Sequence, residues 1–119
     1  MNYKDTVLIV DDEQEICVLL ATIIRKKNML PHYVHTVNAA KEAVHDTYPS
    51  LLFLDINLPD GNGLDLLSEL NKKYPLLKIV IISAYDSFKE KAMSSGAYDF
   101  LPKPFSKDSV NNILNRMVH

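Results

Sequence analysis

Five polar residues stand directly after apolar runs, and their types are suited to chemistry on a phosphoryl group. Asp11 and Asp12 follow the first apolar run, and Asp55 follows a later one. Ser83 and Lys103 come after two further runs. Carboxylates bind hard divalent cations, while a hydroxyl and an ammonium donate hydrogen bonds to phosphoryl oxygens. Taken singly, each acid is better explained as a helix cap, but this does not explain the whole set.

Three carboxylates that lie close together repel one another, and this repulsion costs free energy in the folded state. At about 4 Å and an effective dielectric near 20, each close pair costs roughly 4 kcal/mol. A fold that keeps such a group needs compensating cations, and Lys103 supplies one of them. A divalent metal ion would supply the rest, since Mg2+ binds one or two carboxylates and retains waters and substrate oxygens. The set therefore predicts a magnesium-dependent site for a phosphoryl group.

Apolar patterns predict the elements that carry these residues. Unbroken apolar runs at 6–10, 51–54 and 78–82 predict strands that are buried on both faces. Mixed segments at 32–37 and 98–101 predict two more strands. Five apolar stripes at helical spacing predict helices between and after the strands. The stripes are Ile16, Leu19, Leu20, Ile23 and Ile24; Ala40, Ala43 and Val44; Leu64, Leu67 and Leu70; Phe88, Ala92 and Met93; and Val110, Ile113, Leu114, Met117 and Val118.

Residues that start or end helices support this division. Asn38 and Ser106 are expected to cap the second and fifth helices. The segment from Ser87 to Glu90 fits a capping box for the fourth helix, and Gly96 fits its C-terminal end. Pro49 stops the second helix. The fourth helix has the weakest apolar stripe of the five.

Five strands that alternate with five helices predict an α/β fold with a parallel sheet covered on both faces. Ligands of such sheets bind beyond the carboxyl ends of the strands, near a topological switch point. The five polar residues would all lie at that edge. At 119 residues the chain has the size of one compact domain, and we expect residues 1–119 to form a single domain with no effector domain.

Composition excludes several other classes of protein. The formal net charge is -2, and the longest cationic run, at 25–27, suits a helix C-terminus, so we expect no direct nucleic-acid binding. Cys17 is the single cysteine, which allows no internal disulfide, and we expect it to be a buried apolar residue. The four histidines lack ligand spacing. Without a signal peptide or a membrane span, the expected location is cytoplasmic.

Four motifs closely resemble the receiver domains of bacterial two-component response regulators, in the family's order and spacing. They are Val10-Asp11-Asp12, Leu54-Asp55-Ile56-Asn57-Leu58-Pro59, Ile82-Ser83-Ala84 and Lys103-Pro104-Phe105. Each motif alone is weak, but all four together, one at each strand end, are specific. The resemblance covers essentially the whole chain. It implies a flavodoxin-like (βα)5 doubly wound sandwich with a five-stranded parallel sheet in the order 2-1-3-4-5.

The resemblance also implies a role for each carboxylate. Asp55 would accept a phosphoryl group from a phosphohistidine on a sensor histidine kinase or a histidine phosphotransfer protein. Asp12 and Asp55 would bind Mg2+ directly, with Mn2+ as a substitute, and the backbone carbonyl of Asn57 would be a third ligand. Asp11 would act mainly through water. The chain would catalyse only its own phosphorylation and slow dephosphorylation, and so would not be a turnover enzyme.

The remaining motif positions imply contacts with the phosphoryl group and a switch. Ser83 and Lys103 would contact phosphoryl oxygens, and Ala84 matches the small residue that keeps the site open. The Lys103–Pro104 bond is expected to be cis. If Ser83 moves toward the new oxygens, it vacates space that Phe100 can fill, so the region of the fourth strand and fourth helix would switch. Alternatively, Phe100 is an ordinary core residue with no role in switching.

Tyr85 is bulky and lies two residues beyond Ser83, near the expected mouth of the site. We hypothesise that it limits the access of water and lengthens the phosphorylated lifetime.

The resemblance also implies a contact surface, the face of the fourth helix, fifth strand and fifth helix. In this family that face usually contacts a downstream protein, an effector domain or a second copy in a homodimer. Here that face carries Lys89, Lys91, Tyr98 and Lys107.

Two functions other than a phosphoryl-accepting receiver remain to be considered. A phosphatase of the haloacid dehalogenase type also uses an aspartate nucleophile with Mg2+ and a lysine. That family needs a second aspartate two residues on as a general acid, where this chain has Asn57, which cannot donate a proton in that way. The second alternative is a receiver that serves only as a docking module. Since every residue of the phosphorylation set is present, nothing in the sequence favours it.

Overall fold

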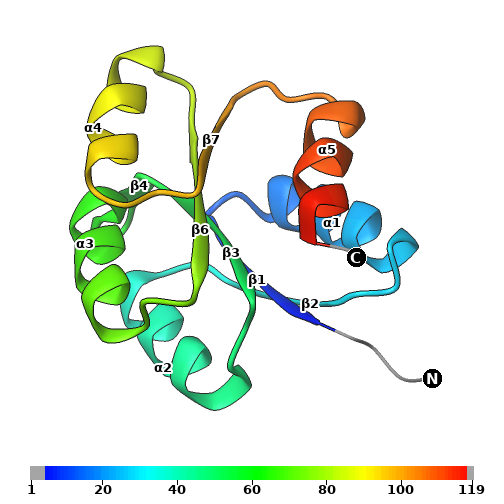
Figure 1. Cartoon of the computed structure of the whole chain (residues 1–119), viewed down its shortest axis with the longest axis horizontal. Helices are drawn as coiled ribbons and strands as arrows, with labels where there is room; N and C mark the ends of the chain where they lie inside the picture. Colours follow the sequence, from blue (N-terminus) through cyan, green and yellow to red (C-terminus); the bar gives the residue numbers. More distant parts are fainter. Residues whose placement is uncertain (1–4, 118–119) are drawn as a thin grey trace.

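The structure, a computed structural model, describes residues 5–117 and has one central parallel sheet (Figure 1). Its five strands lie in the order β2-β1-β3-β6-β7. Their bounds are β1 Thr6–Val10, β2 Leu30–Val34, β3 Leu51–Asp55, β6 Lys78–Ser83 and β7 Asp99–Pro102. A small antiparallel hairpin of β4 (Asn57–Leu58) and β5 (Gly61–Asn62) lies between β3 and the third helix. Counted along the sheet strands alone, the order is 2-1-3-4-5, which confirms the predicted fold.

Helices cover both faces of the sheet (Figure 1). They are α1 Gln14–Lys26, α2 Val37–Thr47, α3 Gly63–Lys73, α4 Lys89–Ser94 and α5 Lys107–Met117, and a short 3-10 turn, Asp86–Phe88, precedes α4. Helices α1 and α5 lie on one face, and α2, α3 and α4 lie on the other. Among residues 5–117, no helix combines the length and the apolar character that crossing a membrane requires.

Strand β1 shows why the central strands are unbroken apolar runs. Val7 and Ile9 pack in the cluster under α1 and α5, whereas Leu8 and Val10 pack in the cluster under α2, α3 and α4. All four side chains are fully buried. Because successive side chains point to opposite faces and both faces are covered, each position has to be apolar. Burial of such a side chain stabilises the fold by about 1.5–3 kcal/mol.

The predicted stripe of α1 is confirmed except at one position. Leu19 is 45% exposed, while Cys17 and Ala21 are buried in the same helix. The buried side of α1 is therefore rotated toward its smaller residues, which allow the helix to lie close to the sheet. Cys17 is buried, as predicted.

The bounds of β2 and the start of α2 differ from the prediction. The strand predicted at 32–37 spans Leu30–Val34, because pairing with β1 places Leu30 opposite Thr6. Helix α2 is capped by Thr36, whose hydroxyl oxygen accepts from the Ala39 N–H at 3.0 Å, so the cap predicted at Asn38 is wrong. An exposed edge strand carries a weaker apolar pattern than a central one, and its bounds depend more on pairing.

The capping box predicted at Ser87 is also wrong, since Phe88 is the N-cap of α4 and no side chain caps this helix. The helix has six residues, and Met93 is 41% exposed while Ala92 is buried. Gly96, with φ of 103°, lies just past the helix end as predicted. The Ser106 hydroxyl caps α5 as predicted, because its oxygen accepts from the Ser109 N–H at 3.1 Å. Val118 lies outside the described residues.

Gly63 allows the chain to fold back against the end of β3. Its N–H donates to the Ile56 carbonyl oxygen at 2.7 Å. A Cβ at position 63 would lie 2.1 Å from the Asp55 carbonyl oxygen and 2.8 Å from Ile56 Cα. Both are backbone atoms, so they cannot give way as a side chain can. This close approach needs glycine, and it fixes the hairpin that follows Asp55.

We therefore expect Gly63→Ala to lower the free energy of unfolding by at least about 1–3 kcal/mol, the usual cost of overpacking. Gly61→Ala is the matched control. Its Cβ would meet only the Val37 side chain, at 3.0 Å from Cγ2, which can shift. Urea unfolding of both variants measures the difference. Equal stability of the two variants would show that the backbone contact at position 63 does not matter.

Candidate functional site

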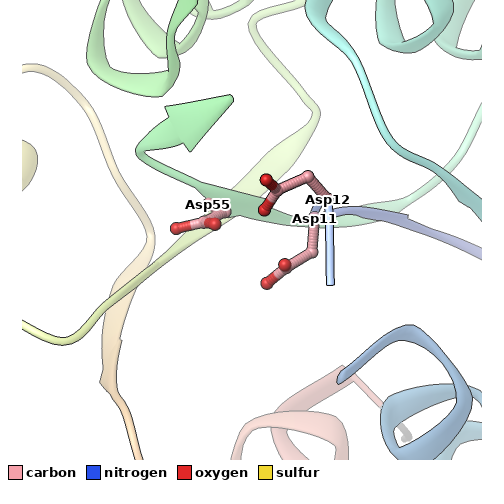
Figure 2. Close-up of side chains that lie close together, drawn as sticks. All are labelled: Asp11, Asp12 and Asp55. Atoms are coloured by element: carbon pink, nitrogen blue, oxygen red, sulfur yellow. The ribbon is translucent and has the colours of Figure 1, made fainter. Parts of the chain in front are cut away.

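The register of the sheet brings the polar residues to one edge. Val10 pairs with Leu54, and Asp55 pairs with Ile82, so Asp11, Asp55 and Ser83 follow one another across neighbouring strand ends. Figure 2 shows the side chains of Asp11, Asp12 and Asp55 entering one space from the ends of β1 and β3. One carboxylate oxygen from each of the three lies within 4.8 Å of the others. The predicted convergence of the three carboxylates is confirmed.

Lys103 joins this group from the end of β7. Its N–H donates to the Ser83 carbonyl oxygen at 2.8 Å, and the Lys103–Pro104 peptide bond is cis, as the sequence resemblance implies. Its ammonium Nζ lies 3.0 Å from Asp11 Oδ2, 3.2 Å from Glu13 Oε2 and 3.5 Å from Asp55 Oδ2. One ammonium therefore contacts three carboxylates. These charges raise the pKa of Lys103 despite its burial, so it is fully protonated at neutral pH.

Asp11 is fully buried and only partly satisfied. Its Oδ1 accepts from the Glu13 N–H at 2.9 Å. Its Oδ2 is near the Lys103 ammonium, but the geometry is not that of a hydrogen bond, and no described residue donates one to this atom. Burial raises the pKa of Asp11, and the Glu13 N–H and Lys103 oppose that rise. Burial outweighs these contacts, so a further cation or an ordered water at Asp11 Oδ2 would stabilise the site.

Asp55 is also strained electrostatically. Burial raises its pKa to about 6, and the neighbouring charge of Asp11 adds to the rise, while Lys103 opposes it. The single ammonium does not offset the carboxylates around it. The three aspartates offer hard oxygen ligands, so this cluster could hold a metal ion. The donor set and the incompletely bonded Asp11 Oδ2 both fit a divalent cation.

Ser83 lies at the same edge, with its hydroxyl engaged elsewhere. It is 3% exposed, and its Oγ accepts from the Tyr85 N–H at 3.0 Å. Among the described residues, no hydrogen bond joins this hydroxyl to the carboxylates. Ala84 and Tyr85 are exposed, and the Tyr85 ring packs edge-on against Phe88 with 6.3 Å between centroids. Phe100 is buried in the cluster that also contains Ala92.

Three further residues, Asn57, Pro104 and Asp60, lie in the segments that follow the strand ends. Asn57 and Pro104 are exposed, and Asn57 begins the β4–β5 hairpin. The Asp60 carboxylate, at the tip of this hairpin, accepts from the N–H groups of Val37 and Asn38 at 2.7 and 3.0 Å. These bonds tie the hairpin to the start of α2. They also hold the pKa of Asp60 below its usual range.

Sequence reasoning missed two contributors to the site. No pattern in the sequence singles out Glu13, whose carboxylate reaches Lys103. The same holds for Asp60, whose carboxylate ties the β4–β5 hairpin to the start of α2. A pair such as Glu13 and Lys103, 90 positions apart, has no local signal. Gly63 begins α3, and the close approach to Asp55 that requires glycine there has no signal in the sequence.

Comparisons with known proteins identify the family. The model of the response regulator receiver domain family matches residues 7–115, and the chain belongs to this family. It is thus a receiver domain of the kind found in two-component response regulators, whose family role is to accept a phosphoryl group. It is 32% identical over 117 residues to the DNA-binding transcriptional regulator NtrC of Proteus hauseri, covering 97% of this chain and 25% of that protein.

Two further similar proteins support the same family assignment. The chain is 35% identical over 112 residues to the sensory transduction protein LytT of Bacillus subtilis, covering 92% of the chain and 46% of LytT. The crystal structure of the receiver domain of NtrX from Brucella abortus superimposes with a TM-score of 0.87 at 36% identity, covering 92% of this chain and 95% of that one. The chain spans less than two thirds of the length of NtrC and LytT.

The raised pKa of Asp55 predicts how stability depends on pH without metal. An unfolded aspartate titrates near 3.9, whereas folded Asp55 titrates at about 6, so the folded state binds more protons between these values. The free energy of unfolding in EDTA should therefore fall as pH rises from about 4 to 6, and the loss persists above 6. Asp55→Asn removes this penalty and should stabilise the metal-free protein at pH 7.5 by on the order of 2 kcal/mol.

Glu42→Gln, which removes an exposed carboxylate of α2, is the control and should leave stability nearly unchanged. Urea unfolding at pH 4.5 and 7.5 tests both variants. If Asp55→Asn is less stable than the wild type at pH 7.5, the buried carboxylate is not electrostatically strained.

Proposed function

We propose that Asp55 accepts a phosphoryl group from a phosphohistidine of a partner sensor kinase or histidine phosphotransfer protein. The observation that carries this proposal is the burial of Asp55 beside Asp11, with Lys103 Nζ 3.5 Å from its Oδ2. Phosphoryl transfer depends mainly on positioning and charge neutralisation, and this carboxylate is held at a strand end with a cation next to it. Family membership supports the same role.

The transfer needs only a nucleophile and a leaving group from the two proteins. A carboxylate oxygen of Asp55 forms a bond to phosphorus as the bond from phosphorus to the donor imidazole nitrogen breaks. The imidazole nitrogen takes the electron pair and is protonated by solvent. Asp55 then carries an acyl phosphate, and the Lys103 ammonium pairs with one of its oxygens.

Magnesium is the metal that we infer for the acidic cluster. The Asp12 and Asp55 carboxylates and the Asn57 carbonyl would hold the ion, with Asp11 acting mainly through water. Oxygen ligands suit Mg2+, and Mn2+ could replace it. When bound, the ion would neutralise negative charge that gathers on the phosphoryl oxygens. This cation would also relieve the repulsion between Asp11 and Asp55.

Ser83 and Phe100 are the proposed switch. To bond a phosphoryl oxygen, the Ser83 hydroxyl has to leave the Tyr85 backbone, which rearranges the link between β6 and α4. Phe100 could then enter the space that Ser83 leaves. Helix α4 has six residues and buries only Ala92 among them, so this region costs little to move. A shift from mostly off to mostly on needs roughly 5.5 kcal/mol, which a few charge-assisted hydrogen bonds at about 1.5–3 kcal/mol each supply.

The face of α4, β7 and α5 is the proposed contact surface for a downstream protein, an effector domain or a second copy. Its position supports this, because it includes the elements next to Ser83 and Phe100. A change at β6 and α4 would therefore alter this face directly.

We expect Tyr85 to shield the acyl phosphate from water. Tyr85 is 59% exposed, its N–H donates to the Ser83 hydroxyl oxygen, and its ring packs edge-on against Phe88. Tyr85→Ala should speed the loss of phosphate several-fold, by about 2–5 times, as expected for a partial rather than a complete water barrier. The decay of phosphorylated protein after removal of the donor measures this rate. An unchanged rate would exclude the shielding role.

Incubation with acetyl phosphate and Mg2+ tests the proposed function. Intact-protein mass spectrometry should show a gain of one phosphoryl group, because a small donor needs no partner protein. The gain should disappear in Asp55→Asn and in EDTA, and it should persist in the exposed control Asp65→Asn. A phosphoryl group that still attaches to Asp55→Asn would overturn the assignment of the acceptor.

A further inference from the structure

The Lys103 ammonium has a partner that lies outside the set of aspartates. Its Nζ donates a hydrogen bond to Glu13 Oε2 at 3.2 Å, which is shorter than its hydrogen bond to Asp55 Oδ2 at 3.5 Å. Asp11 Oδ2 is closer still, at 3.0 Å, but without hydrogen-bond geometry. The better of the two hydrogen bonds that this cation makes to a carboxylate therefore goes to Glu13.

Glu13 is placed so that its side chain is available for this contact. It is the N-cap residue of α1, but its side chain makes no cap hydrogen bond. Its backbone is fixed, because its N–H donates to Asp11 Oδ1 at 2.9 Å. A carboxylate at an N-cap normally bonds the first turn of its own helix. Here it reaches across to a residue 90 positions away.

The partners of Lys103 differ in how easily they can be exchanged. The side chains of Asp11 and Asp55 are 0% and 9% exposed, whereas that of Glu13 is 60% exposed. Glu13 can turn into solvent at little cost, since an exposed ion pair contributes little stability. The two aspartates have no such freedom. When new oxygens arrive near Asp55, Glu13 is the partner that can leave.

We propose that Glu13 is a positioning residue that holds Lys103 in the resting state and competes with the phosphoryl group for its ammonium. This inference rests on the proposed phosphoryl transfer to Asp55. An ammonium has three N–H donors, and here three carboxylates surround it. A phosphoryl oxygen at Asp55 competes with these carboxylates for the ammonium, and exposed Glu13 is the partner that it can displace. Glu13 thereby slows phosphorylation and weakens the hold of Lys103 on the product.

Two variants separate competition from a simple change in charge. Glu13→Gln removes the charge and weakens the bond to Lys103. Glu13→Asp keeps the charge but shortens the side chain, and an aspartate at this position favours the N–H groups of its own helix. If Glu13 competes by contact, both variants should react faster. If only the local negative charge matters, Glu13→Asp should behave as the wild type.

The experiment compares phosphorylation rates with acetyl phosphate at saturating Mg2+. Glu13→Gln and Glu13→Asp should both react faster by about two- to fivefold, the range that an exposed ion pair is worth. Glu15→Gln is the control, because Glu15 is exposed in the same helical turn and forms no ion pair with another described residue. It should react at the wild-type rate.

A second readout does not depend on the reaction. In metal-free protein, the NMR signals of the Lys103 ammonium and its adjoining methylene should shift in both Glu13 variants and stay in place in Glu15→Gln. A merely structural role of Glu13 in α1 would leave these signals unchanged in variants of equal melting temperature.

The outcomes are distinguishable. If the wild-type chain gains no phosphoryl group, the proposed function fails. If it does gain one but both Glu13 variants match it in rate, only the competition fails. Competition is also overturned if Glu13→Asp keeps the wild-type rate while Glu13→Gln is faster, or if Glu15→Gln is accelerated to the same extent.

Discussion

Carboxylates that are buried beside one another raise the free energy of a folded protein unless cations compensate them. In this receiver domain, Asp11 and Asp55 are buried at adjacent strand ends, and one ammonium, that of Lys103, lies between them. The compensation is incomplete, because burial and the charge of Asp11 still raise the pKa of Asp55 to about 6. The resting site is therefore held in a state that an additional cation would stabilise.

The rest of the fold keeps these charges from moving apart. Unbroken apolar strands, buried on both faces, fix the positions of Asp11 and Asp55 at their ends. The Lys103 N–H is bonded to the Ser83 carbonyl, so the lysine cannot withdraw with its backbone. Gly63 lets the start of α3 lie against the backbone of Asp55 and Ile56. A stable sheet thus maintains a local arrangement that would separate in a flexible loop.

Three parts of the site are free enough to change. Glu13 can exchange partners, and α4 is short. Within residues 5–117, the Ser83 hydroxyl is bonded only to the backbone of Tyr85. Glu13 precedes α1 on one face of the sheet, whereas α4 lies on the other face. Under the proposed function, phosphorylation of Asp55 would alter the region of β6 and α4 and leave the core in place.

Sequence reasoning succeeded where a local pattern had a single structural consequence. Apolar runs predicted the central strands, and the motifs at their ends predicted which side chains meet. It failed where long-range contacts decide. The start of β2 follows from pairing with β1. One further miss is local, because Thr36 and Asn38 are both suitable caps for α2 and only the structure shows that Thr36 is used. The contact of Glu13 with Lys103 depends on the sheet, which brings the ends of β1 and β7 to one edge, and no local spacing contains this information.

A calorimetric titration of Mg2+ into the wild-type chain and Asp55→Asn tests most directly whether the buried acids form one cation site. We expect a single site per chain in the wild type, and a loss of affinity of roughly tenfold or more in the variant, since a charged ligand is removed. Equal affinity in the two proteins, or no binding by the wild type, would contradict the assignment of Asp11, Asp12 and Asp55 to a common metal-dependent pocket.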